Sequence, residues 1–303
     1  IYNINLEPSP DGAYRSLDID KLFRAYQLLI KKHELLRTYF QVDTDTATPM
    51  QTVVDINSEK LKIHPFTMVE DALKITDTNR LETFLQDDRK KGMDLSEPPL
   101  CRVALQKITS TKGTTFKMVV TMHHLIHDGW SLGLLLDDLC YFYTTPHYVP
   151  ESKDTLSFYE YILWEQKYHA THKQEYWNRE FVQNRIRNDS DVNTSQYAST
   201  MIDGNTAMQY WEEVPKKTLI IMKAMSKKSG LTPSSIFQSA FVLALTYESA
   251  SQFSYGTMSS GRTASLSKVN SLCAPLVRML PVCFTWNSSQ DTFMDLVIAL
   301  QKK

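Results

Sequence analysis

The sequence lacks several features that would assign it to a specialised class of protein. Only 4 of its 303 residues are cysteine and no two form a CxxC pair, which excludes a disulfide framework and favours a reducing, cytoplasmic setting. With 9 glycines and 12 prolines, the chain is neither fibrous nor low in complexity. It has no run of about 18 apolar residues, so we expect no membrane-spanning helix.

The chain also lacks an excess of charge of either sign, because 33 Lys and Arg residues stand against 34 Asp and Glu residues. A protein that binds nucleic acid or an anionic membrane surface usually carries a basic excess, so we expect neither as a main partner. Hydrophobic residues, at 42%, and aromatic residues, at 11%, suffice for a real core. The length fits two lobes or one large domain.

Hydrophobic periodicity predicts helices and strands in both halves of the chain, and hence an α/β fold made of α+β layers. In the first half we expect a helix that begins at an N-cap Asp18 and helices over residues 81–89 and 157–181. The first-half strands are expected at residues 36–42, 100–106 and 116–122. In the second half we expect helices at 217–228 and 233–248 and strands at 252–257 and 276–286. The polar residues 185–205 predict a linker.

The sharpest chemical feature is the segment His123–Gly129, with the sequence HHLIHDG, directly after a predicted buried strand. A histidine at a strand end can accept or orient a proton near neutral pH, because its ordinary pKa is about 6.5. The leucines that follow mark one face of a helix, for which Ser131 is the predicted N-cap.

Taken alone, a histidine and an aspartate four residues apart are a weak signal, because such spacings are common by chance. Asp128 could hold the imidazole of His124, or it could pair with a distant arginine and fix the loop. Gly129 permits a backbone conformation that a side chain would forbid. A metal site is conceivable, but adjacent histidines on a strand point to opposite faces, so we expect no metal ion.

Together with four further segments, this motif resembles the signature set of nonribosomal peptide synthetase condensation domains, in the chloramphenicol-acetyltransferase-like superfamily. Lys32–Phe40 is similar to the RHExLRTxF motif, with Lys32 in place of the usual arginine. Ser157–Trp164 is similar to the YxDYAVW motif. Tyr255–Arg262 resembles the fGtvvSGR segment, and Leu276–Val282 resembles NTLPLRV. The five segments follow the family order over most of the chain.

The sequence departs from the family pattern in places. The early SxAQxR segment is absent, Cys283 stands where an arginine is common, and the family domain is longer than this chain. We therefore expect an N-terminal lobe over residues 1–175, which carries the HHxxxDG motif, and an incomplete C-terminal lobe over residues 176–303. The resemblance implies that the two chloramphenicol-acetyltransferase-like lobes form a V with a central tunnel.

The resemblance also implies a function, namely an amide-forming acyltransferase. The amine of one carrier-bound substrate would attack the acyl thioester of another, each on the phosphopantetheine arm of an upstream or downstream peptidyl carrier domain. Adenylation domains of a larger synthetase would be neighbours, and the chain itself would need no bound cofactor. Two alternatives stay open, a non-catalytic module that binds carriers or scaffolds its neighbours and a stand-alone acyl-CoA-dependent acyltransferase.

Four motif residues are the expected catalytic site. His124 would take the proton of the amine or only aim the amine, and His123 would support the loop. Asp128 would be structural, paired with Arg37, and the N–H of Gly129 could stabilise a developing oxyanion.

Three further residues are assigned around this site. Arg37 would be a buried structural partner, and Trp164 would give structural support by packing within a lobe. Arg262 would face the tunnel or, equally well, form a surface salt bridge. We expect His127 to be partly exposed and to have no catalytic role.

Overall fold

The chain forms two compact units. Unit 1 consists of Ile1–Gln166 and Ser260–Val277, and unit 2 consists of Lys167–Ser259 and Arg278–Lys303. The computed structural model describes residues 1–4, 17–72, 79–110, 113–145, 147–148, 156–168, 212–246, 252–262, 265–285 and 292–302. The lobe boundary expected at residue 175 lies outside these residues. The segment 260–277, called the 260–277 loop below, belongs to unit 1 although the chain enters and leaves it through unit 2.

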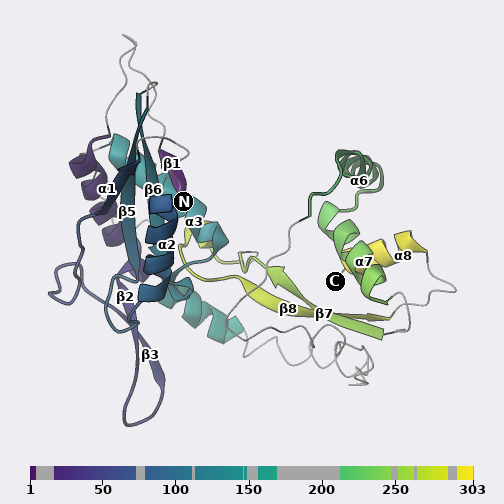
Figure 1. Cartoon of the computed structure of the whole chain (residues 1–303). Coiled ribbons are helices and arrows are strands. Elements are labelled where there is room, and N and C mark those ends of the chain that lie inside the picture. The colour runs from purple at the N-terminus through teal and green to yellow at the C-terminus, as the bar shows by residue number, and fades with distance from the viewer. Residues whose placement is uncertain are drawn as a thin grey trace. The chain divides into compact units, whose positions relative to one another are not determined.

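A four-stranded sheet is the frame of unit 1, with the strand order β1-β6-β5-β4 (Figure 1). The strands expected at residues 100–106 and 116–122 are observed as β5 (Cys101–Ser110) and β6 (Gly113–Met122). They form a hairpin that pairs antiparallel from Cys101 opposite Met122 to Ser110 opposite Gly113. Strand β1 (Tyr2–Ile4) pairs antiparallel with β6, and β4 (Thr67–Ala72) pairs parallel with β5.

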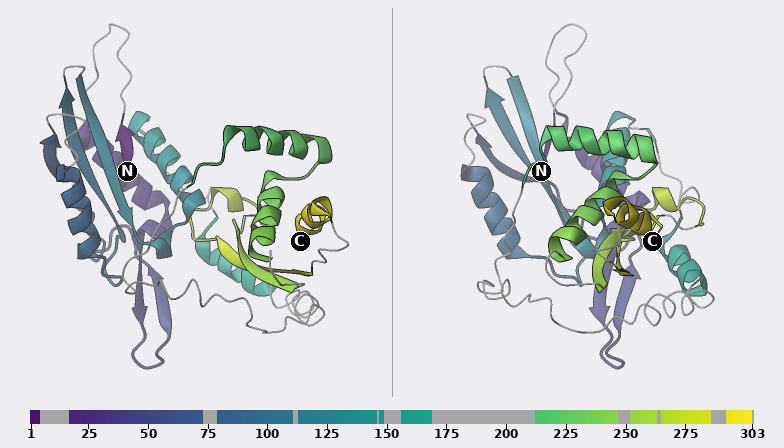
Figure 2. Two further views of the ribbon diagram at one scale, coloured as in Figure 1. Left: turned by 45° about the vertical axis from the view of Figure 1, so that its right-hand side comes forward. Right: turned by 90° about the vertical axis from the view of Figure 1, so that its right-hand side faces the viewer.

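Side chains along β5 point alternately to the two faces of the sheet and contribute to a different hydrophobic core on each face. Cys101, Val103 and Leu105 belong to the main core, with buried residues of α1 (Ile19–Lys32) and α3 (Gly129–Thr144). Ala104 points the other way and packs with Leu81 of α2 (Asn79–Lys91). Helix α2 thus covers one face of the sheet, and α1 and α3 cover the other (Figures 1 and 2).

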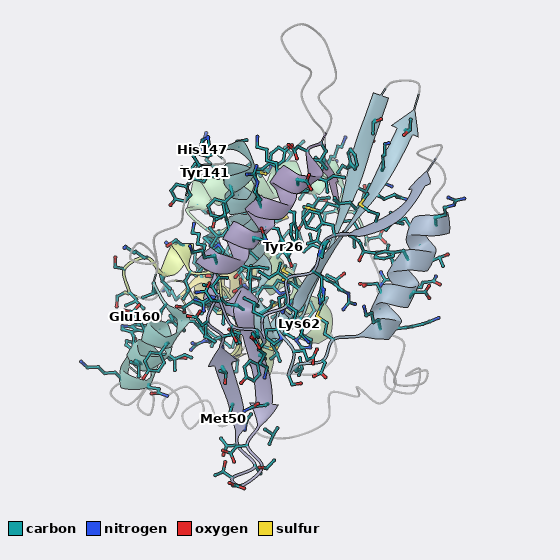
Figure 3. The ribbon with its side chains drawn as sticks, turned by 90° about the vertical axis from the view of Figure 1, so that its left-hand side faces the viewer. Tyr26, Met50, Lys62, Tyr141, His147 and Glu160 are labelled. Carbon is teal, nitrogen blue, oxygen red and sulfur yellow. The ribbon has the colours of Figure 1, made fainter. Side chains whose placement is uncertain are left out.

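Helix α1 begins where the sequence predicts, because the side chain of Asp18 accepts a hydrogen bond from the backbone N–H of Lys21 at 2.8 Å. Its buried residues form one helical stripe at positions 22, 25, 26, 29 and 30. Tyr26 lies inside unit 1, as Figure 3 shows, with its hydroxyl 3.1 Å from the Sγ of Cys101. The stripe packs α1 against β5, the partner of the strand β6 that leads to the histidine motif.

The other elements of unit 1 are short. A 3-10 helix η1 (Glu34–Arg37) leads into the antiparallel hairpin of β2 (Thr38–Val42) and β3 (Pro49–Val53), whose end carries Met50 (Figure 3). The helix expected over residues 157–181 is observed over 158–168, and the rest of it lies outside the described residues. A last 3-10 turn, η4 (Val269–Ser271), lies in the 260–277 loop.

Unit 2 contains α6 (Lys216–Ser229), α7 (Pro233–Thr246), α8 (Phe293–Gln301) and the antiparallel pair β7 (Gln252–Ser259) and β8 (Arg278–Thr285). Gly230 follows the last turn of α6 with φ of +69°, so the helix expected over 217–228 ends at a glycine in the left-handed conformation. Val242, Leu296 and Leu300 form a core beside the β7–β8 pair, against which α7 and α8 lie (Figure 2). Within the described ranges, no helix is long and apolar enough to cross a membrane.

A close backbone approach shapes the 260–277 loop at Gly261. Its φ is +68°, and a Cβ added there would lie 2.1 Å from the carbonyl oxygen of Leu276. Glycine is therefore needed at this position both for its conformation and for space.

We expect Gly261→Ala to lower the free energy of unfolding by more than about 2 kcal/mol, because left-handed strain alone costs about 1–2 kcal/mol. The matched control is Gly92→Ala in the same unit, since Gly92 has φ of +61° and an added Cβ would meet nothing within 4 Å. Urea unfolding measures both variants. Equal losses would contradict the close approach to Leu276.

Candidate active site

The histidine motif forms the connection between β6 and α3. The N–H of His123 donates to the carbonyl of Leu100 at 3.0 Å, and its Nδ1 accepts from the N–H of Leu125 at 3.2 Å, which starts the 3-10 turn η2 (His124–Ile126). Because Nδ1 accepts this bond, the neutral His123 ring carries its proton on Nε2. His123 thus supports the turn through its own ring.

The N-cap of α3 is Asp128, so the expected cap at Ser131 is wrong. The Oδ1 of Asp128 accepts from the N–H of Ser131 at 2.8 Å. The reason is geometric, because a carboxylate at the N-cap reaches the N–H three residues on, and Ser131 is that third residue. This cap places the first turn of α3 directly after the histidine turn.

Two imidazoles stack beside this cap. The rings of His124 and His127 lie 4.8 Å apart between centroids, with 9° between their planes. His124 is exposed, whereas His127 is only 8% exposed, so the expectation that His127 is partly exposed is wrong. The Nδ1 of His127 lies 3.2 Å from the carbonyl oxygen of His123. A carbonyl oxygen can only accept, so Nδ1 carries the proton and donates it.

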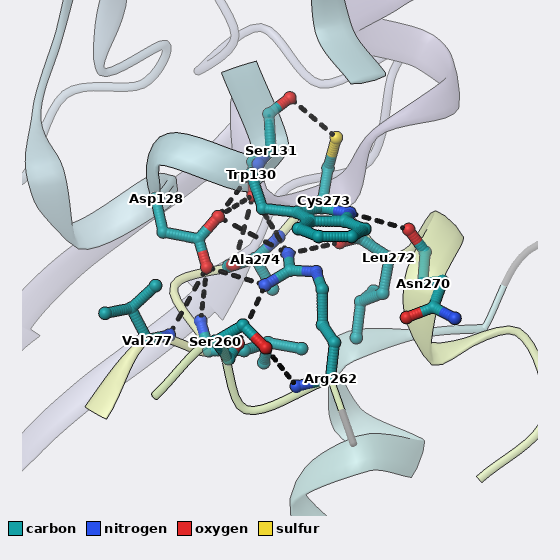
Figure 4. A network of polar contacts seen from close by, with 11 residues as sticks. Asp128, Trp130, Ser131, Ser260, Arg262, Asn270, Leu272, Cys273, Ala274 and Val277 are labelled. Carbon is teal, nitrogen blue, oxygen red and sulfur yellow. Dashed lines mark hydrogen bonds and ion pairs between the residues drawn. The ribbon is translucent and has the colours of Figure 1, made fainter. Parts of the chain in front are cut away.

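Asp128 forms a buried ion pair with Arg262 of the 260–277 loop (Figure 4). Nη1 of Arg262 lies 2.8 Å from Oδ2 of Asp128, and the two side chains are only 2% and 5% exposed. Arg262 also donates to the carbonyls of Leu272 at 2.9 Å and Ser260 at 3.2 Å. Its guanidinium lies under the indole of Trp130, 5.5 Å from the ring centroid.

The prediction that Asp128 pairs with Arg37 is therefore wrong. Arg37 lies at the end of η1, where its Nη1 donates to the carbonyl of Val54 and its carbonyl accepts from the N–H of Val54 at 2.9 Å. It ties η1 to the end of the β2–β3 hairpin, and Asp128 takes its partner from a loop 134 residues away. The surface salt bridge expected as one alternative for Arg262 is also wrong, because that side chain is buried.

Ser131, which sequence reasoning identified only as a cap, is the second polar centre of this network. Its fully buried Oγ lies 2.7 Å from Oδ1 of Asp128, to which it donates, and it accepts from the N–H of Ala274 at 3.0 Å. Oδ2 of Asp128 accepts from the N–H groups of Leu276 at 3.0 Å and Val277 at 3.3 Å. The sequence contained one sign of this contact, namely the serine that ends HHLIHDGWS. A hydroxyl three residues after an N-cap carboxylate can donate a hydrogen bond to that carboxylate.

Trp130 was also missed as a contributor. It is 49% exposed, and its indole N–H donates to the carbonyl of Asn270 at 3.0 Å (Figure 4). With its ring over Arg262, it links the start of α3 to η4. The 260–277 loop is thus attached to the motif at several points.

Hydrogen bonds keep the carboxylate of Asp128 charged. Burial acts to raise its pKa, but the hydrogen bonds from Arg262 and Ser131 outweigh burial and hold the pKa below its ordinary value. His127 shows the opposite balance, because burial is the main cause that lowers its pKa. The carbonyl of His123 and the charge of Asp128 partly offset this lowering.

Gly129 is the first residue of α3, so its N–H has no partner within the helix. The expectation that this position needs a glycine conformation is wrong. Gly129 is not among the glycines with positive φ, and an added Cβ would meet nothing within 4 Å. Its suggested contact with an oxyanion stays a prediction that depends on the N–H alone.

Trp164 lies on the helix over residues 158–168, partly buried against the main core of unit 1. Its ring centroid lies 5.9 Å from that of Tyr161. The role of Trp164 as structural support stays a prediction. In the described part of the chain, no group of three or more His, Cys, Asp or Glu side chains could hold a metal ion.

Comparisons with known proteins point in one direction. The family model described as Condensation domain matches residues 12–303. A subunit of the linear gramicidin synthase of Brevibacillus parabrevis is 26% identical over 298 residues. The match covers 94% of this chain and 5% of that subunit. This chain therefore spans about a twentieth of that relative's length.

Solved structures agree in fold. The epimerization domain from the third module of tyrocidine synthetase B matches with a TM-score of 0.64 and 16% identity, over 95% of this chain and 65% of that one. The first condensation domain of the CDA synthetase matches with a TM-score of 0.64 and 16% identity, over 94% and 65%. The predicted mixed α/β fold is confirmed by these likenesses.

The buried ion pair gives a direct prediction for stability. We expect Arg262→Met to lower the free energy of unfolding by about 3–5 kcal/mol, because it leaves the charge of Asp128 buried without its partner. The control is Lys32→Met, which removes a half-buried partner of Asp138 at 2.7 Å and should cost about 1 kcal/mol or less. Chemical denaturation measures both, and a loss for Arg262→Met no larger than for Lys32→Met would disprove the pair's importance.

The lowered pKa of His127 gives a prediction for pH. Below the ordinary value of about 6.5, the unfolded chain binds a proton that the folded chain does not yet bind, so stability falls as the pH falls. The facing groups are His123 and His124, which oppose this protonation, and Asp128, which favours it. In His127→Phe, the melting temperature should fall less between about pH 7.5 and about pH 5 than in the unchanged chain. If the melting temperatures of the two proteins fall equally with pH, the lowered pKa of His127 is contradicted, because all other histidines are common to both proteins.

Proposed function

Because the chain belongs to the condensation-domain family, whose model matches residues 12–303, we propose that it forms an amide bond between two carrier-bound substrates. The acceptor's amine attacks the carbonyl carbon of the donor's thioester. The C–N bond forms and the C–S bond breaks. The donor's thiol leaves with the proton that the amine loses, so atoms and charge balance.

The observation that carries this proposal is the exposed ring of His124, which lies between His123 and His127, whose rings are both hydrogen-bonded to the backbone. No hydrogen bond to a ring nitrogen of His124 exists among the described residues, so both nitrogens are free for a substrate. The demand on His124 is modest, because an α-amine with a pKa of about 7.7–8.0 is already about one-tenth neutral at pH 7. His124 accepts the proton of the attacking amine or aims that amine, and positioning of two tethered reactants supplies much of the acceleration.

The other motif residues support His124 in this proposal. His123 holds the turn, and Asp128 fixes the start of α3 through Arg262. The free N–H of Gly129 at the N-terminus of α3 faces the developing oxyanion, where the helix dipole favours negative charge. Arg37 and Trp164 keep the surrounding elements in place.

The proposed partners are peptidyl carrier domains, each with its substrate on a phosphopantetheine arm, and adenylation domains of the same synthetase. The name of the gramicidin synthase relative supports a role in peptide assembly. We propose a reducing cytoplasmic setting, since all four cysteines are free thiols. The chain itself binds no cofactor in this scheme.

The test uses the complete natural polypeptide that contains this sequence, with loaded donor and acceptor carriers and intact-mass detection. The acceptor carrier should gain the donor's acyl group. His124→Ala should lower the rate by about 10²–10⁴-fold, the usual contribution of a positioned proton acceptor. The control, His64→Ala, removes an exposed histidine outside the motif and should leave the rate unchanged.

Contrary results either reject the catalytic role of His124 or favour another function. If His124→Ala matches the unchanged protein, the catalytic assignment fails. Carrier binding without product favours the scaffold module, and acyl transfer from soluble acyl-CoA favours the stand-alone acyltransferase. Inversion of the donor's Cα without transfer would indicate epimerisation, the function named for one neighbour of this fold.

A further inference from the structure

We propose that His127 is a positioning residue, which holds the imidazole of His124 in one orientation through a stacked ring and a pinned turn. The inference rests on the proposed function, because it gives His124 a task in which orientation matters. It concerns a residue that the motif alone predicts to be exposed and idle.

The stack covers one face of an otherwise exposed ring. Its near-parallel planes, 9° apart at a centroid distance of 4.8 Å, are the geometry of an offset stack. His124 is exposed and His127 is buried, so the buried ring is a fixed platform for the exposed one. Stacking leaves the edge nitrogens of His124 free, since it uses only the ring face.

The platform is itself anchored at the backbone. The Nδ1–H of His127 donates to the carbonyl of His123 at 3.2 Å, across the whole 3-10 turn that carries His124. The backbone of His127 is extended, with φ of −156° and ψ of 165°. One side chain therefore closes the turn and supports the ring of its first residue.

This arrangement suits a site that handles an amine. The charged groups that face His127 are His123, His124 and Asp128, and the net effect of these groups and of burial is a lowered pKa. His127 therefore stays neutral at neutral pH, keeps its Nδ1 proton and adds no positive charge beside His124. A protonated ring at this place would repel a protonated His124 and would be buried at a cost.

Three variants separate the stack from mere filling of space. His127→Phe keeps an aromatic ring but loses the hydrogen bond to His123. His127→Leu fills similar space with an apolar side chain and loses both the ring and the hydrogen bond. His64→Leu is the matched control for a His→Leu change at an exposed site.

The first measurement is the NMR signal of the Cε1–H group of His124 at a mildly alkaline pH, in protein with labelled histidine. A stacked ring displaces this signal through its ring current. We expect the signal in His127→Leu to move to the position of an unstacked imidazole. In His127→Phe it should stay on the stacked side of that position, because a phenyl ring exerts at least as strong a ring current as imidazole. An unmoved His124 signal in a folded His127→Leu protein would overturn the inference.

The second measurement is kinetic and uses the complete natural polypeptide with loaded carriers. We expect His127→Leu to lower kcat by about 10- to 100-fold with the KM for the acceptor carrier unchanged, because misorientation affects the reaction and not docking. His127→Phe should recover most of kcat, and His64→Leu should match the unchanged protein. An unchanged kcat, or a loss confined to KM, would overturn the inference.

The two measurements keep this inference apart from the proposed function. If the unchanged protein forms no product, the proposed function fails, and the NMR comparison still decides whether His127 holds the ring of His124. If His127→Leu does not fold, His127→Phe decides through the same signal and through kcat. If the His124 signal in folded His127→Phe lies at the position of an unstacked imidazole, the inference is overturned.

Discussion

The buried ion pair between Asp128 and Arg262 is the constraint on which the motif depends. A charge inside a protein is tolerated only when it is paired and hydrogen-bonded, because desolvation otherwise costs several kcal/mol. Asp128 meets this demand with Arg262, the hydroxyl and N–H of Ser131 and two backbone N–H groups of the 260–277 loop. One carboxylate thereby caps α3 and attaches a loop that is distant in sequence.

From this anchor, the three histidines of the motif acquire different environments within five residues. His123 accepts a backbone hydrogen bond and shapes the turn, His127 is buried and donates to the backbone, and His124 remains exposed. Three chemically identical side chains therefore differ in exposure and hydrogen bonding, and His124 is the one with an exposed ring. Such a difference suits the proposed amide-forming reaction. The donor thioester is already activated, so the reaction mainly needs the two substrates to be oriented.

Local features of the fold could be predicted from the sequence, and distant pairings could not. The cap at Asp18, the β5–β6 hairpin and the helix stop at Gly230 depend on neighbouring residues, so periodicity and capping rules find them. Arg262 lies 134 residues from Asp128, and no local pattern marks it as the partner in place of Arg37. The burial of His127 and Ser131 likewise depends on tertiary packing, which a motif does not reveal.

Backbone hydrogen exchange in Arg262→Met tests the central role of the ion pair most directly. The amides of Leu276 and Val277 donate to Asp128, so they report whether the 260–277 loop stays attached to the motif. We predict that both amides exchange much faster in the variant, while the amides of the β5–β6 hairpin keep their protection. Unchanged protection of Leu276 and Val277 in a folded variant would contradict the account.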